Sequence, residues 1–255
     1  MGWQLKAAAD IGGRDEQQDR VEILSAGDGD AHLIVLADGM GGHLDGARAA
    51  QTVVETAGRL FAQTVPDPPS FLRELCGQAH RAIWDLREAE DRSPGSTCVL
   101  LYLDERGAFW AHVGDSRLYH FRAGELMDRT FDHSVLRLML EQGRVRSTDP
   151  AAEQLQGQLY MRLGGSEDPV PDMGATPVSD GDLFLMCSDG LWAWVEPEEV
   201  ASTLHDLPLE EGAAHLLELA RARGGREGDN ISLALARWPG AASRPLLKRL
   251  FSRRG

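Results

Sequence analysis

The sequence predicts an α+β fold in which two stacked antiparallel β-sheets are flanked by pairs of antiparallel helices. Apolar runs typical of strands occur in separate blocks, and two segments with helical periodicity follow each of the first two blocks. The resulting order is strands, two helices, many strands, two helices and one strand. Helix pairs placed in this order can cover the outer faces of two packed sheets.

The first half of the chain contains three expected strands and two expected helices. Alanines and valines give residues 44–63 one apolar helical face, and prolines after residue 65 end that helix. Ser70 is expected to cap the second helix. The expected elements are strands at 3–11, 20–24 and 33–38, a turn at Asp28-Gly29, and helices at 44–63 and 70–87.

The second half begins with short strands. Turn residues recur at short intervals between residues 98 and 121, which predicts adjacent antiparallel strands in a meander. Residues 131–171 have a weak pattern, so we expect a small lobe or a flap over a site. The expected elements are strands at 98–103, 108–113, 116–121, 183–188 and 231–238, and helices at 134–142, from Glu196 onward, and at 210–223.

The composition fits one large domain with an acidic surface. The 255 residues, of which 42% are hydrophobic, can bury a full core. The net charge of -14 argues against nucleic acid as the main partner. Cys76, Cys98 and Cys187 have neither paired nor CxxC spacing, so neither a disulfide framework nor a zinc site is indicated and a reducing cytoplasm is the expected location.

The two ends of the chain differ, because only the C-terminal end is basic and amphipathic. The N-terminus lacks the apolar centre of a signal peptide, and no apolar run is long enough to span a bilayer. We expect a monomer in which residues 1–240 form the domain and residues 241–255 a basic tail. A solvated helix or frayed end is favoured for this tail over contact with a membrane or an acidic partner.

Four Asp-Gly pairs occur in the chain, and the residues before each pair separate them into two groups. Asp28 and Asp180 follow polar or small residues and are typical of turns. Asp38 and Asp189 follow long apolar runs, which suits buried strands that deliver a carboxylate to a sheet edge. A hairpin turn is the alternative for each. The Asp229-Asn230 pair strengthens the prediction of a metal site.

Five aspartates from distant segments are the candidate ligands. Oxygen donors without nearby histidine or cysteine favour Mg²⁺ or Mn²⁺ over zinc. Two such ions about 3.5 to 4 Å apart, bridged by a carboxylate and a water, would generate a hydroxide that attacks a phosphate. Arg14 could hold that phosphate. For Asp115, between two strand-like runs, a ligand and a turn or bulge acid are weighted evenly. The candidates are Asp19, Asp38, Asp115, Asp189 and Asp229.

Taken together, the motifs resemble those of the bacterial type 2C metal-dependent serine/threonine protein phosphatases, the PPM family. Each motif is weak alone, but all of them occur in family order over residues 10–238. The matching segments are Arg14-x-x-Gln-Gln-Asp19, Ala37-Asp-Gly-Met-Gly-Gly-His43, Gly95-Ser-Thr97, Val113-Gly-Asp-Ser-Arg117, Cys187-Ser-Asp-Gly190 and Gly228-Asp-Asn230.

The resemblance implies a β-sandwich flanked by helix pairs and a set of metal ligands. Asp38 would bridge two Mn²⁺ or Mg²⁺ ions, and the Gly39 carbonyl would bind one of them. Asp189 and Asp229 would complete the first site. Asp115, together with Asp189, would hold a third and weaker ion near the flap.

The same resemblance assigns roles around the ions and shows two departures. Asp19 would hold metal-bound water from behind the ligands, and Arg14 would bind the substrate phosphate. Many relatives have Glu where this chain has Gln18, so the second ion should be held more loosely. Met40 stands where eukaryotic members carry a histidine proposed as general acid; a metal-bound water is the first candidate to replace it and His43 the second.

The function that the resemblance implies is metal-dependent hydrolysis of phosphoserine and phosphothreonine in proteins, opposing a bacterial serine/threonine kinase. Two alternatives are a degenerate member that acts as a phosphoprotein-binding adaptor and an unrelated metal hydrolase or binding module. The presence of Asp38, Asp189 and Asp229 argues against the adaptor.

Overall fold

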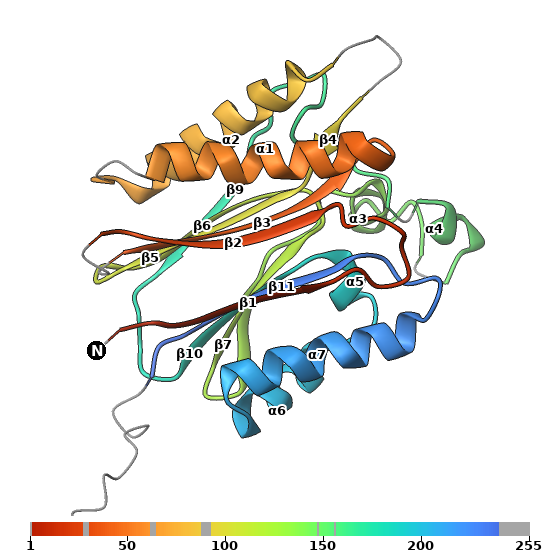
Figure 1. The fold of residues 1–255 in the computed structure, drawn as a ribbon. Coiled ribbons are helices and arrows are strands. Elements are labelled where there is room, and N and C mark those ends of the chain that lie inside the picture. The colour runs from red at the N-terminus through yellow and green to blue at the C-terminus, as the bar shows by residue number, and fades with distance from the viewer. Residues whose placement is uncertain are drawn as a thin grey trace, which may run out of the picture.

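A computed structural model describes residues 2–27, 31–61, 65–87, 93–146, 148–155 and 157–239, which form a sandwich of two antiparallel sheets (Figure 1). The first sheet has the order β1-β11-β10-β7-β8 and the second the order β2-β3-β5-β6-β9, with β4 paired to β3. The strands are β1 Gln4–Asp10, β2 Asp19–Ser25, β3 His32–Met40, β4 Gly95–Ser96, β5 Cys98–Asp104, β6 Gly107–Val113, β7 Arg117–Arg122, β8 Glu125–Arg129, β9 Asp172–Thr176, β10 Asp182–Cys187 and β11 Ile231–Arg237.

Helix pairs cover both outer faces of the sandwich. Helices α1 and α2 lie over the second sheet, and α6 and α7 lie over the first (Figure 1). Helices α3 and α4 project at one end. The predicted helix-flanked sandwich is therefore confirmed. The helices are α1 His43–Phe61, α2 Pro68–Trp84, α3 Val135–Glu141, α4 Pro150–Leu155, α5 Asp189–Trp192, α6 Pro197–Asp206 and α7 Leu209–Gly224.

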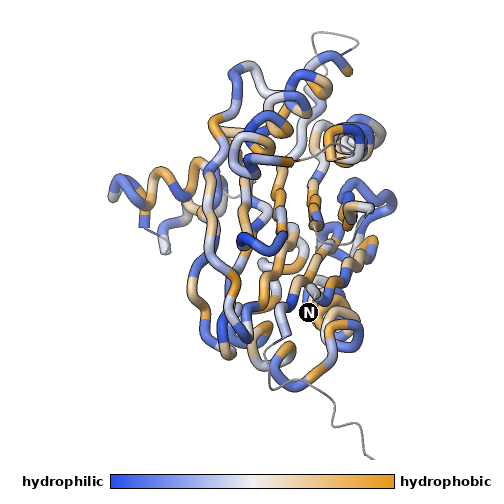
Figure 2. The backbone as a smooth tube through the Cα atoms, turned by 90° about the vertical axis from the view of Figure 1, so that its left-hand side faces the viewer, coloured by the Kyte–Doolittle hydropathy of each residue, from blue (hydrophilic) through white to orange (hydrophobic). Residues whose placement is uncertain are grey.

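The unbroken apolar run in β3 is explained by burial on both faces. Leu33 and Val35 pack in the cluster beneath α1 and α2, whereas Ile34 and Leu36 pack in the cluster between the two sheets. Successive side chains of a strand point to opposite faces, so a strand covered on both sides needs apolar residues throughout. Figure 2 shows the same concentration of hydrophobic residues along the central strands.

The N-cap of helix α2 lies three residues before the predicted cap. Its N-cap is Asp67, and Pro68 and Pro69 form the first turn, so the assignment of Ser70 as the cap was wrong. A proline at the start of a helix loses no hydrogen bond, because the first N–H groups have no partner within the helix, and its ring fixes a helical φ. Pro68 and Pro69, which were interpreted as the end of the preceding helix, therefore also begin α2.

The predicted meander over residues 98–121 was also wrong, because β6 and β7 lie in different sheets. Strands β5 and β6 form a hairpin in the second sheet, while β7 pairs with β10 and β8 in the first. Gly114, with φ of 108°, lies in the bend where the chain crosses between them. Strands β4, β8 and β9 were not predicted, and the Asp28-Gly29 turn and residues 241–255 lie outside the described residues.

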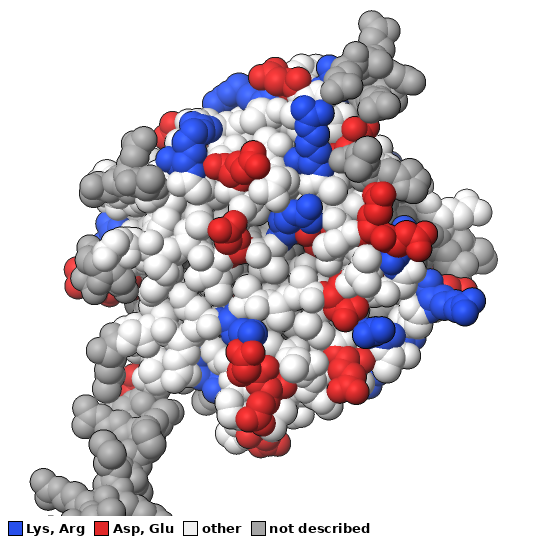
Figure 3. All heavy atoms as spheres, in the orientation of Figure 1, with Lys and Arg blue, Asp and Glu red and all other residues white. Residues whose placement is uncertain are grey.

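The described part of the chain contains no helix long and apolar enough to cross a membrane. On the face drawn in Figure 3, acidic and basic side chains are interspersed.

A buried carboxylate at the start of β10 ties three segments together. Asp182 accepts hydrogen bonds from His120 Nε2 at 2.9 Å, from Arg122 Nε at 2.7 Å and from the Ser179 N–H at 2.7 Å. Burial alone would raise the pKa of Asp182, but the hydrogen bonds from Arg122, His120 and Ser179 outweigh it and hold the pKa below its usual value.

We predict that Asp182→Asn lowers the free energy of unfolding by about 2 to 4 kcal/mol, because it removes the charge that these donors satisfy. Since the folded-state pKa is depressed, this contribution is present above about pH 4 and is lost as the pH falls through the folded-state value. Urea denaturation at pH 7 measures the change, with the exposed Asp206→Asn as control. A loss equal to that of the control would contradict the prediction.

Candidate metal centre

Aspartates from distant segments meet at one end of the sandwich. Asp19 and Asp38 are cross-strand partners in β2 and β3. Asp189 begins α5 just after β10, Asp229 lies just before β11, and Asp115 lies in the bend between β6 and β7. The charge of each of the other four raises the pKa of Asp38, so all four of these carboxylates are within electrostatic reach of Asp38. The structure thus brings together every aspartate that the sequence singled out.

The backbone of Asp38 is fixed by the segment around β4. The Asp38 N–H donates to Thr97 Oγ1 at 2.9 Å, and the Asp38 carbonyl accepts from the Thr97 N–H at 2.9 Å and from Ser96 Oγ at 3.1 Å. These bonds hold the residue without using its carboxylate. The sequence contained Ser96 and Thr97 in a motif, but their role as anchors of Asp38 was not foreseen.

Gly39 lies where three segments pack too closely for a side chain. A Cβ atom there would come within 1.9 Å of the Gly46 carbonyl oxygen in α1. Its N–H donates to the Gln18 carbonyl at 3.2 Å. The Gln18 side-chain oxygen in turn lies against Gly46, at 2.5 Å from where a Cβ would stand. The side chain of Gln18 therefore faces the start of α1.

Asn230 anchors the loop that precedes β2. Its Oδ1 accepts from the Gln18 N–H at 2.8 Å, and its Nδ2 donates to the carbonyls of Ile11 and Glu16, both at 2.9 Å. One buried amide thus joins the polar loop of residues 11–18 to the start of β11. In the sequence, Asn230 served only as part of the Asp229-Asn230 pair that supported a metal site, and its role in anchoring this loop was not predicted.

Asp19 is buried and receives a hydrogen bond of 2.7 Å from Ser188 Oγ. Ser188 Oγ itself accepts from the Ser232 N–H at 3.0 Å, and the Asn230 carbonyl, at 3.4 Å, is a second and more distant acceptor for its proton. Burial, opposed by the Ser188 hydrogen bond and reinforced by the charge of Asp189, raises the pKa of Asp19 to about 7.

The neighbouring acids show the same unfavourable crowding of negative charge. Burial and the charge of Asp189 raise the pKa of Asp115 to about 7. Burial and the charge of Asp229 raise the pKa of Asp189 to about 6. For Asp38, burial and the charge of Asp19 raise the pKa well above the usual value. Full ionisation of the cluster therefore needs a compensating positive charge.

The donor atoms of this cluster fit a divalent metal ion. Asp189 Oδ1 is buried and has no hydrogen-bond partner among the described residues. A buried carboxylate oxygen without a partner needs an ion or a water. Because the cluster offers carboxylate oxygens, the ions it suits best are Mg²⁺ and Mn²⁺.

Asp115 is held by an aromatic and cationic stack that the sequence did not reveal. Trp192 Nε1 donates to the Asp115 carbonyl at 2.9 Å. The Arg117 guanidinium lies 3.6 Å from the centre of a Trp192 ring, and it donates to both carboxylate oxygens of Asp132 at 2.8 Å. Arg117 also donates to the Tyr119 hydroxyl at 3.2 Å. Asp115 therefore lies in a bend, which was one of the two alternatives weighed for it, and its charge also reaches Asp38.

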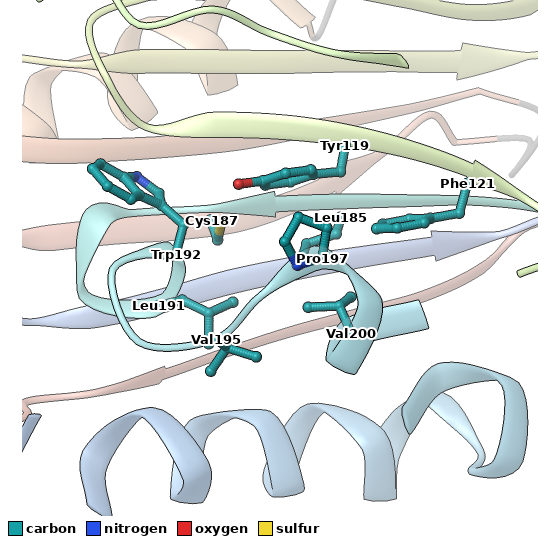
Figure 4. A pocket seen from close by; sticks show the side chains of 9 residues that line it. All are labelled: Tyr119, Phe121, Leu185, Cys187, Leu191, Trp192, Val195, Pro197 and Val200. Carbon is teal, nitrogen blue, oxygen red and sulfur yellow. The ribbon is translucent and has the colours of Figure 1, made fainter. Parts of the chain in front are cut away.

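Beneath this stack lies a narrow apolar gap between the first sheet and the segment from α5 to α6. Figure 4 shows Trp192 and the Tyr119 hydroxyl end at one side of it, with Cys187 and Val200 among the other lining residues. The gap is too narrow to hold a water molecule. Most of the residues that line the gap belong to the hydrophobic core beneath α6 and α7, so the gap is not a substrate pocket.

Arg14 lies at the rim of the cluster. Its Nη2 is 2.6 Å from Asp229 Oδ2, and the side chains are 58% and 38% exposed, so the guanidinium is within reach of a ligand from solvent. His43 begins α1 at the same end, but its side chain lies outside the described residues.

A family model described as protein phosphatase 2C matches residues 11–218. A putative 2C-type protein phosphatase of Streptococcus pyogenes is 31% identical over 209 residues, covering 80% of this chain and 84% of the relative. The serine/threonine phosphatase of S. agalactiae superimposes with a TM-score of 0.85 at 28% identity, covering 92% of this chain and 99% of the other. The catalytic domain of the serine threonine protein phosphatase PstP in complex with 2 manganese ions gives a TM-score of 0.76 at 30% identity, covering 92% and 97%.

We predict that the protein in chelator melts at a lower temperature at pH 8 than at pH 5. The pKa values of Asp19 and Asp115 are raised to about 7 and that of Asp189 to about 6. In the absence of metal the fold favours the protonated form of these carboxyl groups. The stability that they contribute is therefore fully present below about pH 4 and is lost as the pH rises through 6 to 7. A difference of about 5 °C or more is expected in calorimetry.

Excess Mg²⁺ should abolish most of this pH dependence, because a bound cation favours the ionised carboxylates. Asp19→Asn, which removes one of the titrating groups, should flatten the dependence in chelator. Equal melting temperatures at pH 5 and pH 8 in chelator would show that the carboxylates do not repel one another as described.

Proposed function

Because the chain belongs to the protein phosphatase 2C family, we propose that it hydrolyses phosphoserine and phosphothreonine in proteins with the help of Mn²⁺ or Mg²⁺. The observation that carries this proposal is the carboxylate cluster at one end of the sandwich. In it, the charges of four other aspartates raise the pKa of Asp38. No finding favours the alternative of a phosphoprotein-binding adaptor.

The proposed ion sites follow the positions of the acids. Asp38 would be shared by two ions, with the Gly39 carbonyl on one of them and Asp189 and Asp229 completing the first site. Asp115 and Asp189 would hold a third ion. The unpartnered Asp189 Oδ1 and the two manganese ions in the PstP complex support this assignment. Bound ions would supply Lewis-acid activation of the attacking water and neutralise charge on the phosphate.

The protein's own residues would position the reactants. Asp19, held by Ser188, offers a carboxylate oxygen that can accept a hydrogen bond from the attacking water. Arg14 would bind two phosphate oxygens with its planar guanidinium. Its ion pair with Asp229 keeps it beside the cluster before substrate arrives. His43 remains our second candidate for protonating the leaving group, after a water molecule in the site.

The surroundings of the site are also part of the proposal. Helices α3 and α4, within the proposed flap of residues 131–171, project at one end of the sandwich (Figure 1). A flap there would contact the phosphoprotein substrate, within a domain of residues 1–240. The proposed opposing partner is a serine/threonine kinase, and the proposed location is the cytoplasm.

Hydrolysis of a chromogenic phosphate ester and of a phosphothreonine peptide tests this function. Wild type should be active with Mn²⁺ and inactive in chelator. Asp38→Asn should reduce kcat/KM by at least about 1,000-fold, because it removes the charge shared by both ions, while the circular dichroism spectrum stays unchanged. Activity of Asp38→Asn near that of wild type would refute the assignment.

Arg14→Ala should mainly raise KM, because a guanidinium that grips the phosphate acts in both the ground state and the transition state. The expected loss in kcat/KM corresponds to about 1.5 to 3 kcal/mol, as for hydrogen bonds to charged groups. Arg14→Lys keeps the charge but not the fork and should lie in between. A fall in kcat at constant KM would show that Arg14 does not bind the substrate in the ground state.

A further inference from the structure

His112 in β6 is fully buried, and neither of its ring nitrogens makes a well-aligned hydrogen bond within the described residues, although the backbones of Gly114 and Ser116 lie close enough to raise its pKa. Burial, reinforced by the neighbouring His133, lowers the pKa of His112 to about 3, so the ring is neutral and can bind a metal ion. Buried polar groups in folded proteins are nearly always paired, and an exception calls for an ion or an ordered water.

Two further donors surround this ring. Asp172 in β9 is the cross-strand partner of His112, so both side chains lie on the same face of the sheet. His133 is buried, its ring centre is 4.7 Å from that of His112, and its Nε2 is 3.2 Å from Asp172 Oδ2. One ligand atom from each of the three residues lies within 4.8 Å of the other two.

We propose that His112, His133 and Asp172 form a binding site for Zn²⁺ that is separate from the carboxylate cluster. Two imidazoles and one carboxylate are donors that Zn²⁺ prefers, and they leave a fourth position open. Ligand atoms around tetrahedral zinc are about 3.3 Å apart, so the three donors, which lie within 4.8 Å of one another, would close in by up to about 1.5 Å on binding the ion. Asp172, whose side chain is 64% exposed, provides the route by which the ion enters.

The hydrogen bonds between His133 and Gly114 connect the proposed zinc site to Asp115, which follows Gly114 in the chain. The ring Nδ1 of His133 accepts a hydrogen bond from the Gly114 N–H at 3.2 Å, and the backbone N–H of His133 donates to the Gly114 carbonyl at 2.8 Å. An ion on Nε2 moves the imidazole proton to Nδ1, which displaces the Gly114 N–H. Coordination bonds to a metal outweigh one long neutral hydrogen bond. Zinc binding therefore shifts the Gly114-Asp115 bend at the edge of the carboxylate cluster.

The sequence had indicated no zinc site, because that expectation rested on cysteine spacing. The three ligands are far apart in the chain and come together only through the pairing of β6 with β9 and through the segment that enters α3.

The test uses Co²⁺ as a spectroscopic probe for Zn²⁺ on the full chain, stripped of metal and kept in excess Mg²⁺ to occupy the carboxylate cluster. Four-coordinate Co²⁺ absorbs strongly in the visible range, whereas Co²⁺ on six oxygens absorbs weakly. Wild type should bind one equivalent with a strong band that Zn²⁺ displaces, and elemental analysis should find one zinc per chain.

Asp172→Asn should weaken this binding by at least a hundredfold, and Asp172→His should restore it with a shifted band. Asp168→Asn is the matched control, since Asp168 is also an exposed acid near a buried histidine, 3.6 Å from His80. This control and Asp38→Asn should keep the band. A wild type without the band, or a band that survives in Asp172→Asn or disappears in Asp38→Asn, would overturn the proposal.

Discussion

The structure depends on holding several carboxylates together against their mutual repulsion at one end of a sandwich. Burial and neighbouring charge raise the pKa values of Asp19, Asp38, Asp115 and Asp189. Such a cluster costs folding free energy unless cations bind it. A protein tolerates this cost at a functional site, where the unfavourable charge is what gives affinity for the ligand.

The fold withstands the repulsion because hydrogen bonds anchor the backbone beside several of these acids. Thr97 holds both backbone groups of Asp38, Trp192 holds the carbonyl of Asp115, and Asn230 ties the N-terminal loop to β11. These anchors lie directly after β4, in α5 and directly before β11, segments that are brought together only in the folded sandwich. The backbones of Asp38 and Asp115 are thus held by neutral hydrogen bonds that leave their carboxylates available to an ion.

The sequence revealed the elements whose signals are local. The apolar run before Asp38 and the one before Asp189 predicted buried strands that end in a carboxylate, and helical periodicity predicted the outer helices. Tertiary context decided the rest. Burial of β3 on both faces and the crossing at Gly114 depend on sheet pairing, and Trp192 could not be linked to Asp115 from its position in the chain. The His112 site likewise exists only through pairing of β6 with β9.

Diffraction from crystals grown with Mn²⁺, recorded at the manganese absorption edge, tests the central claim most directly. Two anomalous peaks within the cluster are expected, both in contact with the Asp38 carboxylate and one also with Asp189 and Asp229. An absence of peaks at the cluster, or peaks that Asp38 does not touch, would contradict the view that these aspartates are held together in order to bind metal.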